Sequence, residues 1–436
     1  ERYGYASGLA DIDEMVSNAI MSEIFYREGI PTERCLLVIA YPDKTAVGVR
    51  AAPNLVRPAH LFRYLKMNNR KDLKTSLDYF MKRQEENGLL ALPRSGRARY
   101  RKVLEYFART YAKLAALMEE EYIFNWLAWD GDNMLASGAL LDYGSIRRFA
   151  AKHSKYRYED VDRFSTSLIE QKIETKKIVQ AFAQAIDFVV TGKKKSFARF
   201  AEHPSLRVFE RSFRLESNRR MLWRAGFTSE QSEALLKDHP AKVAAFSRMV
   251  DYFEDIKTSK GERAVSDGID HPPVFLIRDI LRELPIYIYF NWHHGAKGWP
   301  VMPPDIFCKI MAASYANNED RTLTPHRRQR ALLFQKAYRQ LIETISTSGK
   351  HLSAVKNIMN RSAVINYGYR TTGDGLLWTV DDVISLRNRV PQKQLQKMIE
   401  RFIDSQVLVP GVWHPVHSKE LKGNSPTAHL LRKIKE

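Results

Sequence analysis

Asp130-Gly-Asp-Asn-Met134 is followed by the short apolar run Gly138-Ala-Leu-Leu141 and then by Asp142-Tyr-Gly144. The glycine, Asp and Asn residues indicate turns, and the apolar run between them predicts a short strand. This turn, strand and turn place three carboxylates and one carboxamide close together in the sequence. We refer to the two polar segments as the two acidic turns.

All the candidate ligands in the acidic turns are oxygen atoms. Mg²⁺ prefers such ligands and usually takes one or two carboxylates together with phosphate oxygens and water. Protein kinases also use an Asn and an Asp to hold metal against a nucleotide. The carboxylates and the carboxamide of the acidic turns are therefore compatible with a metal site. Taken alone, Asp130-Gly-Asp-Asn133 is more simply an Asx-rich turn that joins a helix to a hairpin.

Upstream, the sequence predicts one helix and one β-hairpin. Between residues 12 and 28 apolar residues recur at helical spacing, and Gly29-Ile-Pro31 supplies the stop signal. The apolar runs 35–40 and 45–49 flank the turn Tyr41-Pro-Asp-Lys44, which is typical of two paired strands.

Downstream of the hairpin the pattern is mainly helical. Apolar residues recur at intervals of three and four between 60 and 86 and again between 99 and 122, with a loop at 88–96. Helices are again predicted beyond about residue 150. Residues 376–409 are expected to form a helix pair that ends in a short strand, a pattern compatible with a small winged-helix-like module at 376–415.

Two arginines lie near the expected end of the second strand. Arg50 follows the strand directly, and Arg57 comes seven residues later, before Pro58. Guanidinium groups in such positions can bind phosphate through paired hydrogen bonds. Two arginines at this spacing are also ordinary surface charge in a basic protein, so the other motifs must decide between the two interpretations.

The composition is that of a globular protein of two or three domains, because 436 residues with 44% apolar content can bury a sizeable core. No apolar run approaches the ~20 residues that a membrane span needs, so we expect a soluble protein. Cys35 and Cys308 stand in no paired spacing, which argues against disulfides or a thiolate metal site. A reducing compartment is favoured, the cytoplasm or the mitochondrial matrix. Because the chain begins at Glu1 without Met, we expect the true N-terminus upstream.

The net charge of +19 is concentrated in the C-terminal part of the chain. Residues 1–150 contain 22 Lys and Arg against 19 Asp and Glu, which leaves 47 against 31 beyond residue 150. Such an excess attracts nucleic acid, anionic lipid or an acidic protein, but it also keeps a protein soluble. We favour a solvated basic surface, and nucleic-acid binding is a weakly supported alternative.

Taken together, the motifs resemble the selenoprotein O family, protein adenylyltransferases with a protein-kinase-like fold. In that family a helix ending in Gly-Ile-Pro-Thr precedes a hairpin, an Arg-Val-Ala-Pro segment with a second arginine seven residues on, and then Asn-Thr-Asp-Asn-Met and Asp-Tyr-Gly. The matching segments here are Gly29-Ile-Pro-Thr32, Arg50-Ala-Ala-Pro53 with Arg57, Asp132-Asn-Met134 and Asp142-Tyr-Gly144. The spacing of ten residues from Asp132 to Asp142 also agrees. The resemblance covers residues 1 to about 150.

The resemblance implies that ATP is bound with Mg²⁺ (or Mn²⁺) so that a Ser, Thr or Tyr hydroxyl of a protein attacks the α-phosphorus and pyrophosphate leaves. Asp132 would then be the general base, while Asn133 and Asp142 would hold the metal on the phosphates. The residues implied in nucleotide binding are Gly8, Arg50, Arg57 and Asp142.

The chain departs from the family pattern at several positions. The family's N-lobe, with its glycine-rich segment and nucleotide-binding lysine, would precede residue 1. An Asp-Gly pair before the first helix is Ser7-Gly8 here. The helix glutamate that pairs with the lysine falls on Asn18, with Glu14 one turn earlier. Asp130 replaces the first Asn of Asn-Thr-Asp-Asn and adds negative charge, and no cysteine stands near the C-terminus, where some members carry selenocysteine.

We therefore predict an α+β, predominantly helical chain. A protein-kinase-like C-lobe would occupy residues 1–150, with the N-lobe largely absent, and a basic helical region would follow at 151–436. The predicted function is protein adenylyltransfer from ATP to hydroxyl-bearing proteins. Two alternatives stay open. The same metal ligands serve ordinary kinase-type phosphotransfer, and Asn18 and Ser7 favour a catalytically inactive, pseudokinase-like binding scaffold.

Overall fold

The computed structural model describes residues 9–156, 164–259, 271–346, 350–373, 375–422 and 425–432. Helices account for most of these residues, and the strands form two sheets of two strands each. This confirms the expected α+β, predominantly helical class. Within these ranges no helix is both long enough and apolar enough to cross a membrane.

The first part of the chain contains α1 (Ile12–Arg27), β1 (Arg34–Ala40), β2 (Ala46–Ala51), α2 (Pro58–Lys66), α3 (Arg70–Glu86), α4 (Arg97–Glu120), β3 (Ile123–Asn125) and β4 (Ile146–Arg148). The second part contains α5 (Leu168–Thr191), α6 (Pro204–Arg224), α7 (Ser229–Asp238), α8 (Pro240–Glu254), α9 (Ile277–His293), α10 (Pro304–Met311), α11 (Pro325–Ile345), α12 (His351–Ile365), α13 (Gly375–Leu386), α14 (Gln392–Gln406) and α15 (Pro426–Arg432). Short 3₁₀ helices lie at Tyr143–Ser145 and Phe197–Phe200.

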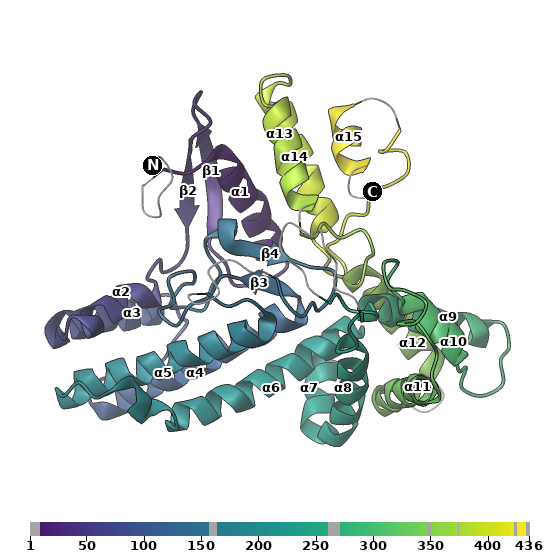
Figure 1. Ribbon diagram of the computed structural model, residues 1–436, viewed down its shortest axis with the longest axis horizontal. Helices are drawn as coiled ribbons and strands as arrows, with labels where there is room; N and C mark the ends of the chain where they lie inside the picture. The colour runs from purple at the N-terminus through teal and green to yellow at the C-terminus, as the bar shows by residue number, and fades with distance from the viewer. Residues whose placement is uncertain are drawn as a thin grey trace.

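α1 and the β1–β2 hairpin form one unit, as the sequence predicts. The strands pair antiparallel with Cys35 opposite Arg50, and the connection turns at Lys44, which has a positive φ of 68°. α1 buries Ile24 and Phe25 completely or nearly so, because they share the stripe that faces the rest of the protein. In Figure 1 this unit stands above the layer of long helices.

The helical stretch predicted at 60–86 consists of two helices, α2 and α3, rather than one. Asn68 has a positive φ of 54°, which α-helical backbone does not allow. The side chain of Asn69 then accepts a hydrogen bond from the backbone N–H of Asp72 and caps the start of α3. The loop predicted at 88–96 and the helix predicted at 99–122, here α4, are both present.

The first hydrophobic core is built around α4. The ring of Phe107 stacks on Phe182 of α5 with 3.7 Å between centroids, and Phe62 of α2 meets Phe182 edge-on at 4.8 Å. Burying rings of this size stabilises the fold by about 1.5–3 kcal/mol each. The same core also takes side chains from α1, α6, α13 and α14. It therefore contains residues from both sides of residue 150, and it supports the loops that follow α4.

A second hydrophobic core lies among the end of α6 and α7 to α12. The ring of Phe246 on α8 stacks on Tyr338 of α11 at 5.5 Å and meets Phe334 at 5.1 Å. Its buried members run from Met221 to Ile358. These helices confirm the mainly helical pattern predicted beyond residue 150, and they lie on the right in Figure 1.

The helix pair predicted at 376–409 is confirmed as α13 and α14, but the short strand predicted after it is wrong. Residues 376–415 contain no strand. Val407 is buried in the first core, and the backbone N–H of Leu408 donates to Glu28 Oε1 at 3.3 Å. The apolar run 407–409 therefore reflects burial of an irregular segment rather than strand pairing, and the strand component of the winged-helix-like module is not formed.

After β4, His153 lies at the edge of a buried aromatic cluster. Its ring is 5.6 Å, centroid to centroid, from both Phe149 and Tyr156, and its Nδ1 atom has no hydrogen-bond partner. Burial, together with the charge of Lys257, lowers the pKa of His153 to about 4.

We expect this histidine to make the protein less stable in mild acid. The unfolded chain binds the proton near pH 6.5 but the folded chain only near pH 4, so between these values the unfolded state binds more protons and gains stability relative to the fold. At about pH 5 the loss is about 2 kcal/mol. Urea unfolding at neutral pH and in mild acid would measure it, with His153→Gln as the variant that lacks the titrating group. Equal acid sensitivity of wild type and variant would contradict the assignment.

Candidate functional site

The two acidic turns are framed by β3 and β4. These strands pair antiparallel, with Asn125 opposite Ile146, and the loop between them carries both turns. The side chain of Asn125 donates from Nδ2 to the backbone oxygen of Asn133 at 3.0 Å, and its Oδ1 accepts from Ser145 Oγ at 3.0 Å. One buried side chain therefore ties the first turn to the second.

The carboxamide of Asn133 has a fixed orientation. Its Nδ2 donates to the backbone oxygen of Trp126 at 2.6 Å. Because this contact directs the amide nitrogen toward the protein, the amide oxygen is the end that can bind a cation. Asp130, in the same turn, makes no side-chain hydrogen bond or ion pair within the described ranges.

Asp142 occupies the left-handed region, with φ 66° and ψ 67°. For a residue with a side chain this costs about 1–3 kcal/mol, so the surroundings must hold it. The backbone oxygen of Asp142 accepts from the N–H and Oγ of Ser145, at 3.1 and 2.8 Å. The next residue, Tyr143, is buried against Phe25 of α1, and its hydroxyl hydrogen-bonds Thr32. These contacts fix the direction in which the side chain of Asp142 leaves the backbone.

Glu33, which the sequence analysis did not single out, holds the second acidic turn. It is 1% exposed, and its Oε1 accepts from the backbone N–H of Asp142 at 3.2 Å. The same oxygen accepts from Arg50 Nη1 at 3.2 Å and from Asn18 Nδ2 at 3.4 Å. Only one signal in the sequence could have revealed Glu33: it is a carboxylate beside an apolar strand, in a segment that must be buried.

Arg57 contacts the first acidic turn. Its Nη1 donates to the backbone oxygen of Asp132 at 2.9 Å and to Oδ1 of the same residue at 3.2 Å. The Asp132 side chain is 55% exposed, so it remains accessible to another molecule. The backbone N–H of Arg57 donates to Nδ1 of His60 at 3.2 Å, and burial, with the nearby Arg57 charge, lowers the pKa of His60.

Arg50 and Arg57 line the same cavity, as their predicted shared role requires. The cavity has a volume of about 440 Å³, and Glu33, His60 and Leu141 also line it. Arg57 reaches the first acidic turn directly, and Arg50 reaches the second through Glu33. The structure thus brings five of the predicted site residues into one connected region, namely Arg50, Arg57, Asp132, Asn133 and Asp142.

Two further predictions concern the start of the chain. Gly8 lies outside the described residues. Asn18, at the predicted position of the helix glutamate, is buried and directed at Glu33, and its Oδ1 has no hydrogen-bond partner. Glu14 instead lies beside the second turn: a Cβ placed on Gly144 would be 3.4 Å from Glu14 Oε1.

The region around Asp142 has the electrostatics of a site that can accept a cation. The pKa of Glu14 is raised, chiefly by burial and next by the negative charge of Asp142. A bound cation would relieve this repulsion. Within the described part of the chain no three His, Cys, Asp or Glu side chains cluster as a metal site by themselves. A cation at Asn133 and Asp142 would therefore need oxygen atoms from phosphate or water as well.

No protein-family model matches the chain, and no curated protein matches it either.

We expect Glu33→Gln to destabilise the protein by about 1–3 kcal/mol, because it removes the buried charge that Arg50 and the Asp142 N–H share. Denaturant unfolding would measure the change. Glu105→Gln is the matched control, since Glu105 pairs with Arg109 on the surface and its loss should cost no more than about 1 kcal/mol. Equal effects of the two substitutions would show that Glu33 does not organise the site.

Proposed function

We propose that this region is the catalytic site of a protein adenylyltransferase with a protein-kinase-like C-lobe. The observation that carries the proposal is the convergence of two arginines on two acidic turns: Arg57 contacts Asp132, and Arg50 reaches Asp142 through Glu33. Both arginines line one cavity, so phosphates placed there would meet positive charge, and Arg57 in the cavity wall contacts Asp132.

In the proposed reaction ATP donates AMP to a protein hydroxyl. The hydroxyl oxygen of a Ser, Thr or Tyr forms a bond to the α-phosphorus, the bond from that phosphorus to the bridging oxygen breaks, and pyrophosphate leaves. Asp132 would accept the hydroxyl proton, for which its exposed carboxylate is accessible. Arg50 and Arg57 would hold the phosphates. Positioning and charge neutralisation of this kind are the main sources of catalysis in phosphoryl-type transfers.

The oxygen ligands of the acidic turns fit Mg²⁺ or Mn²⁺. Asn133 would offer its amide oxygen and Asp142 its carboxylate, and phosphate oxygens and water would complete the coordination. When bound, such an ion neutralises phosphate charge. The repulsion between Glu14 and Asp142 is a second reason to expect a cation here.

A specific observation favours the alternative of a pseudokinase-like scaffold. Asn18 stands where the family resemblance expects a glutamate that pairs with a lysine, and it is engaged with Glu33 inside the protein. If Glu14 does not take over that pairing, a nucleotide would bind without being turned over. Kinase-type phosphotransfer is the other alternative, because the same metal ligands serve it.

The proposal predicts transfer of label from ATP labelled at the α-phosphorus, in the presence of Mg²⁺, to protein. Asp132→Asn and Asp142→Asn should each reduce the transfer by about 100-fold or more, because each keeps the shape of the side chain but removes its charge. Asp78→Asn is the control: this exposed carboxylate on α3 pairs with Lys74 and should be dispensable. Labelled protein can be counted after gel separation.

Other outcomes separate the alternatives. Label that arrives only from the γ-phosphorus would indicate phosphotransfer. Nucleotide binding without any transfer would indicate the scaffold. Full activity of Asp132→Asn would contradict the role of Asp132 as the general base.

A further inference from the structure

A second cavity lies where the two hydrophobic cores meet. Its volume is about 180 Å³, and it shares no lining residue with the cavity beside Arg50 and Arg57. Its walls come from the ends of α1 and α4, from β4, α6 and α7, and from the segments that follow α12 and α14. Nothing in the proposed reaction uses it.

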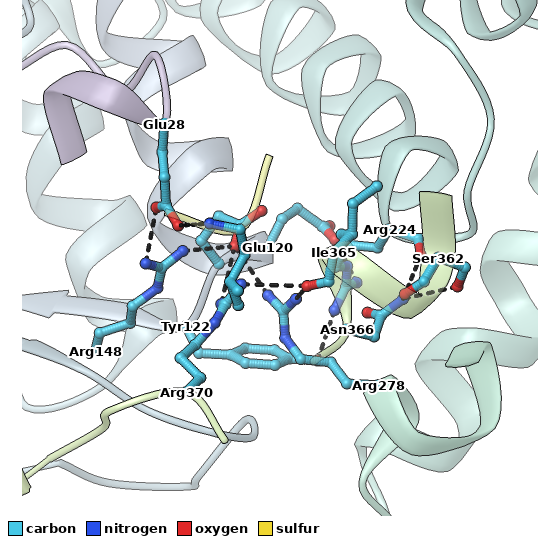
Figure 2. Close-up of polar contacts among 12 residues, drawn as sticks. Glu28, Glu120, Tyr122, Arg148, Arg224, Arg278, Ser362, Ile365, Asn366 and Arg370 are labelled. Atoms are coloured by element: carbon cyan, nitrogen blue, oxygen red, sulfur yellow. Dashed lines mark hydrogen bonds and ion pairs between the residues drawn. The ribbon is translucent and has the colours of Figure 1, made fainter. Parts of the chain in front are cut away.

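Three buried arginines converge on one carboxylate at this cavity. Arg148 of β4, Arg278 of α9 and Arg370, which follows α12, donate to Glu121 Oε2 at 3.3, 2.9 and 3.4 Å. Glu28 accepts from Arg148 at 2.8 Å. Figure 2 shows the side chains of Arg148, Arg278 and Arg370 approaching from different parts of the chain, with Glu28 reaching Arg148 from α1. The side chains of all five residues are less than a tenth exposed.

The wall of this cavity carries an excess of positive charge. Arg148, Arg278 and Arg370 face two carboxylates, while the adjoining Arg224 pairs with two, Glu120 and Glu254. Among the residues that line the cavity itself, four are arginines and three are glutamates, an excess of one positive charge. This excess belongs to the wall as a whole, since Arg219 and Arg220 pair with Glu216 and with Glu233, which does not line the cavity.

Each of the three arginines makes two hydrogen bonds, and Arg370 is the one whose hydrogen bonds are both longer than 3.2 Å. A guanidinium has five N–H donors, but Arg370 makes only two hydrogen bonds, to Glu121 at 3.4 Å and to the backbone oxygen of Ile365 at 3.3 Å. Both are longer than the usual 2.7–3.2 Å range. Burial, and then the charges of Arg148 and Arg278, lower the pKa of Arg370. Arg148 also lines the cavity, and its Nε atom, like that of Arg278, is buried without a hydrogen-bond partner.

We propose that this cavity binds a small phosphate-type oxyanion, with Arg370 and Arg148 as its principal ligands. An anion there would compensate the excess charge and accept hydrogen bonds from the unused N–H groups of Arg370. At roughly 30 Å³ for each water, the cavity has room for about six waters, and so for one phosphate group with at most a small substituent. Such a substituent would lie against the apolar part of the wall, to which Trp223 and Leu408 belong.

An anion in this cavity would contact two parts of the chain at once. Glu28 and Arg148 belong to the part of the chain that carries the acidic turns, whereas Ser232 on α7 and Ile365 on α12 belong to the second part. An anion that binds only the folded protein stabilises the folded state by mass action. We therefore expect phosphate to strengthen the junction between the two parts. This inference is independent of the proposed adenylyl transfer.

Isothermal titration of inorganic phosphate into the protein, at constant ionic strength set with NaCl, tests the proposal. We expect saturable binding at one site in wild type and a loss of affinity of about tenfold or more in Arg370→Gln. Arg109→Gln is the matched control: it removes a surface guanidinium that pairs with Glu105 and lines neither cavity, so its affinity should stay within about threefold of wild type. Arg57→Gln should also bind normally, because it alters only the other cavity.

Two outcomes would overturn the proposal. One is the absence of saturable phosphate binding to wild type, and the other is undiminished affinity in Arg370→Gln. A loss of binding in Arg57→Gln alone would place phosphate in the other cavity and would equally reject the assignment. Phosphate should also raise the melting temperature of wild type at constant ionic strength, so a test remains if Arg370→Gln does not fold. Tighter binding of phenyl phosphate than of inorganic phosphate would identify the ligand as a phosphomonoester; the reverse order would identify the free ion.

Discussion

The arrangement of the chain depends on one interaction, in which the buried carboxylate of Glu121 accepts hydrogen bonds from three arginines. Glu121 stands at the end of α4, the helix at the centre of the first core, and it receives arginines from β4, from α9 in the second part, and from the segment that leads into α13. Burial alone would raise the pKa of Glu121, but Arg278, Arg370 and Arg148 together lower it well below the ordinary value. Removing one partner from such a group leaves a buried charge and costs about 3–5 kcal/mol, so the parts that supply the partners are held together.

Glu33 has the same role on a smaller scale at the candidate site. Its carboxylate connects α1 through Asn18, the hairpin through Arg50 and the second acidic turn through the N–H of Asp142. The left-handed backbone of Asp142 is costly by itself, and the contacts from Glu33 and Ser145 offset that cost. The direction of the carboxylate proposed to bind metal is therefore set by the buried carboxylate of Glu33 rather than by the turn sequence alone.

The sequence predicted the local features of the site and missed those that join distant segments. α1, the hairpin and the two acidic turns each depend on a pattern within a few residues and are present, but the short strand predicted between the turns is not formed, since Leu140 makes only isolated bridges. Glu33 and Glu121 were missed because their partners are remote: Arg370 is separated from Glu121 by 249 positions. The strand predicted near Val407 is absent for another reason. A short apolar run indicates burial, and burial can be reached by an irregular segment as well as by a strand.

Under the proposed function, the contact between Arg57 and Asp132 links nucleotide binding to the freeing of Asp132 as the general base. One nitrogen, Nη1 of Arg57, donates to both the backbone oxygen and Oδ1 of Asp132, so the carboxylate is partly occupied while the cavity holds no phosphate. Phosphate oxygens compete for the same donor, and a phosphate carries more charge than one carboxylate. The hydrogen bond from the Arg57 N–H to neutral His60 anchors the backbone of Arg57, so only its side chain needs to move. ATP would thus draw the guanidinium from Asp132 and leave that carboxylate to receive the substrate hydroxyl.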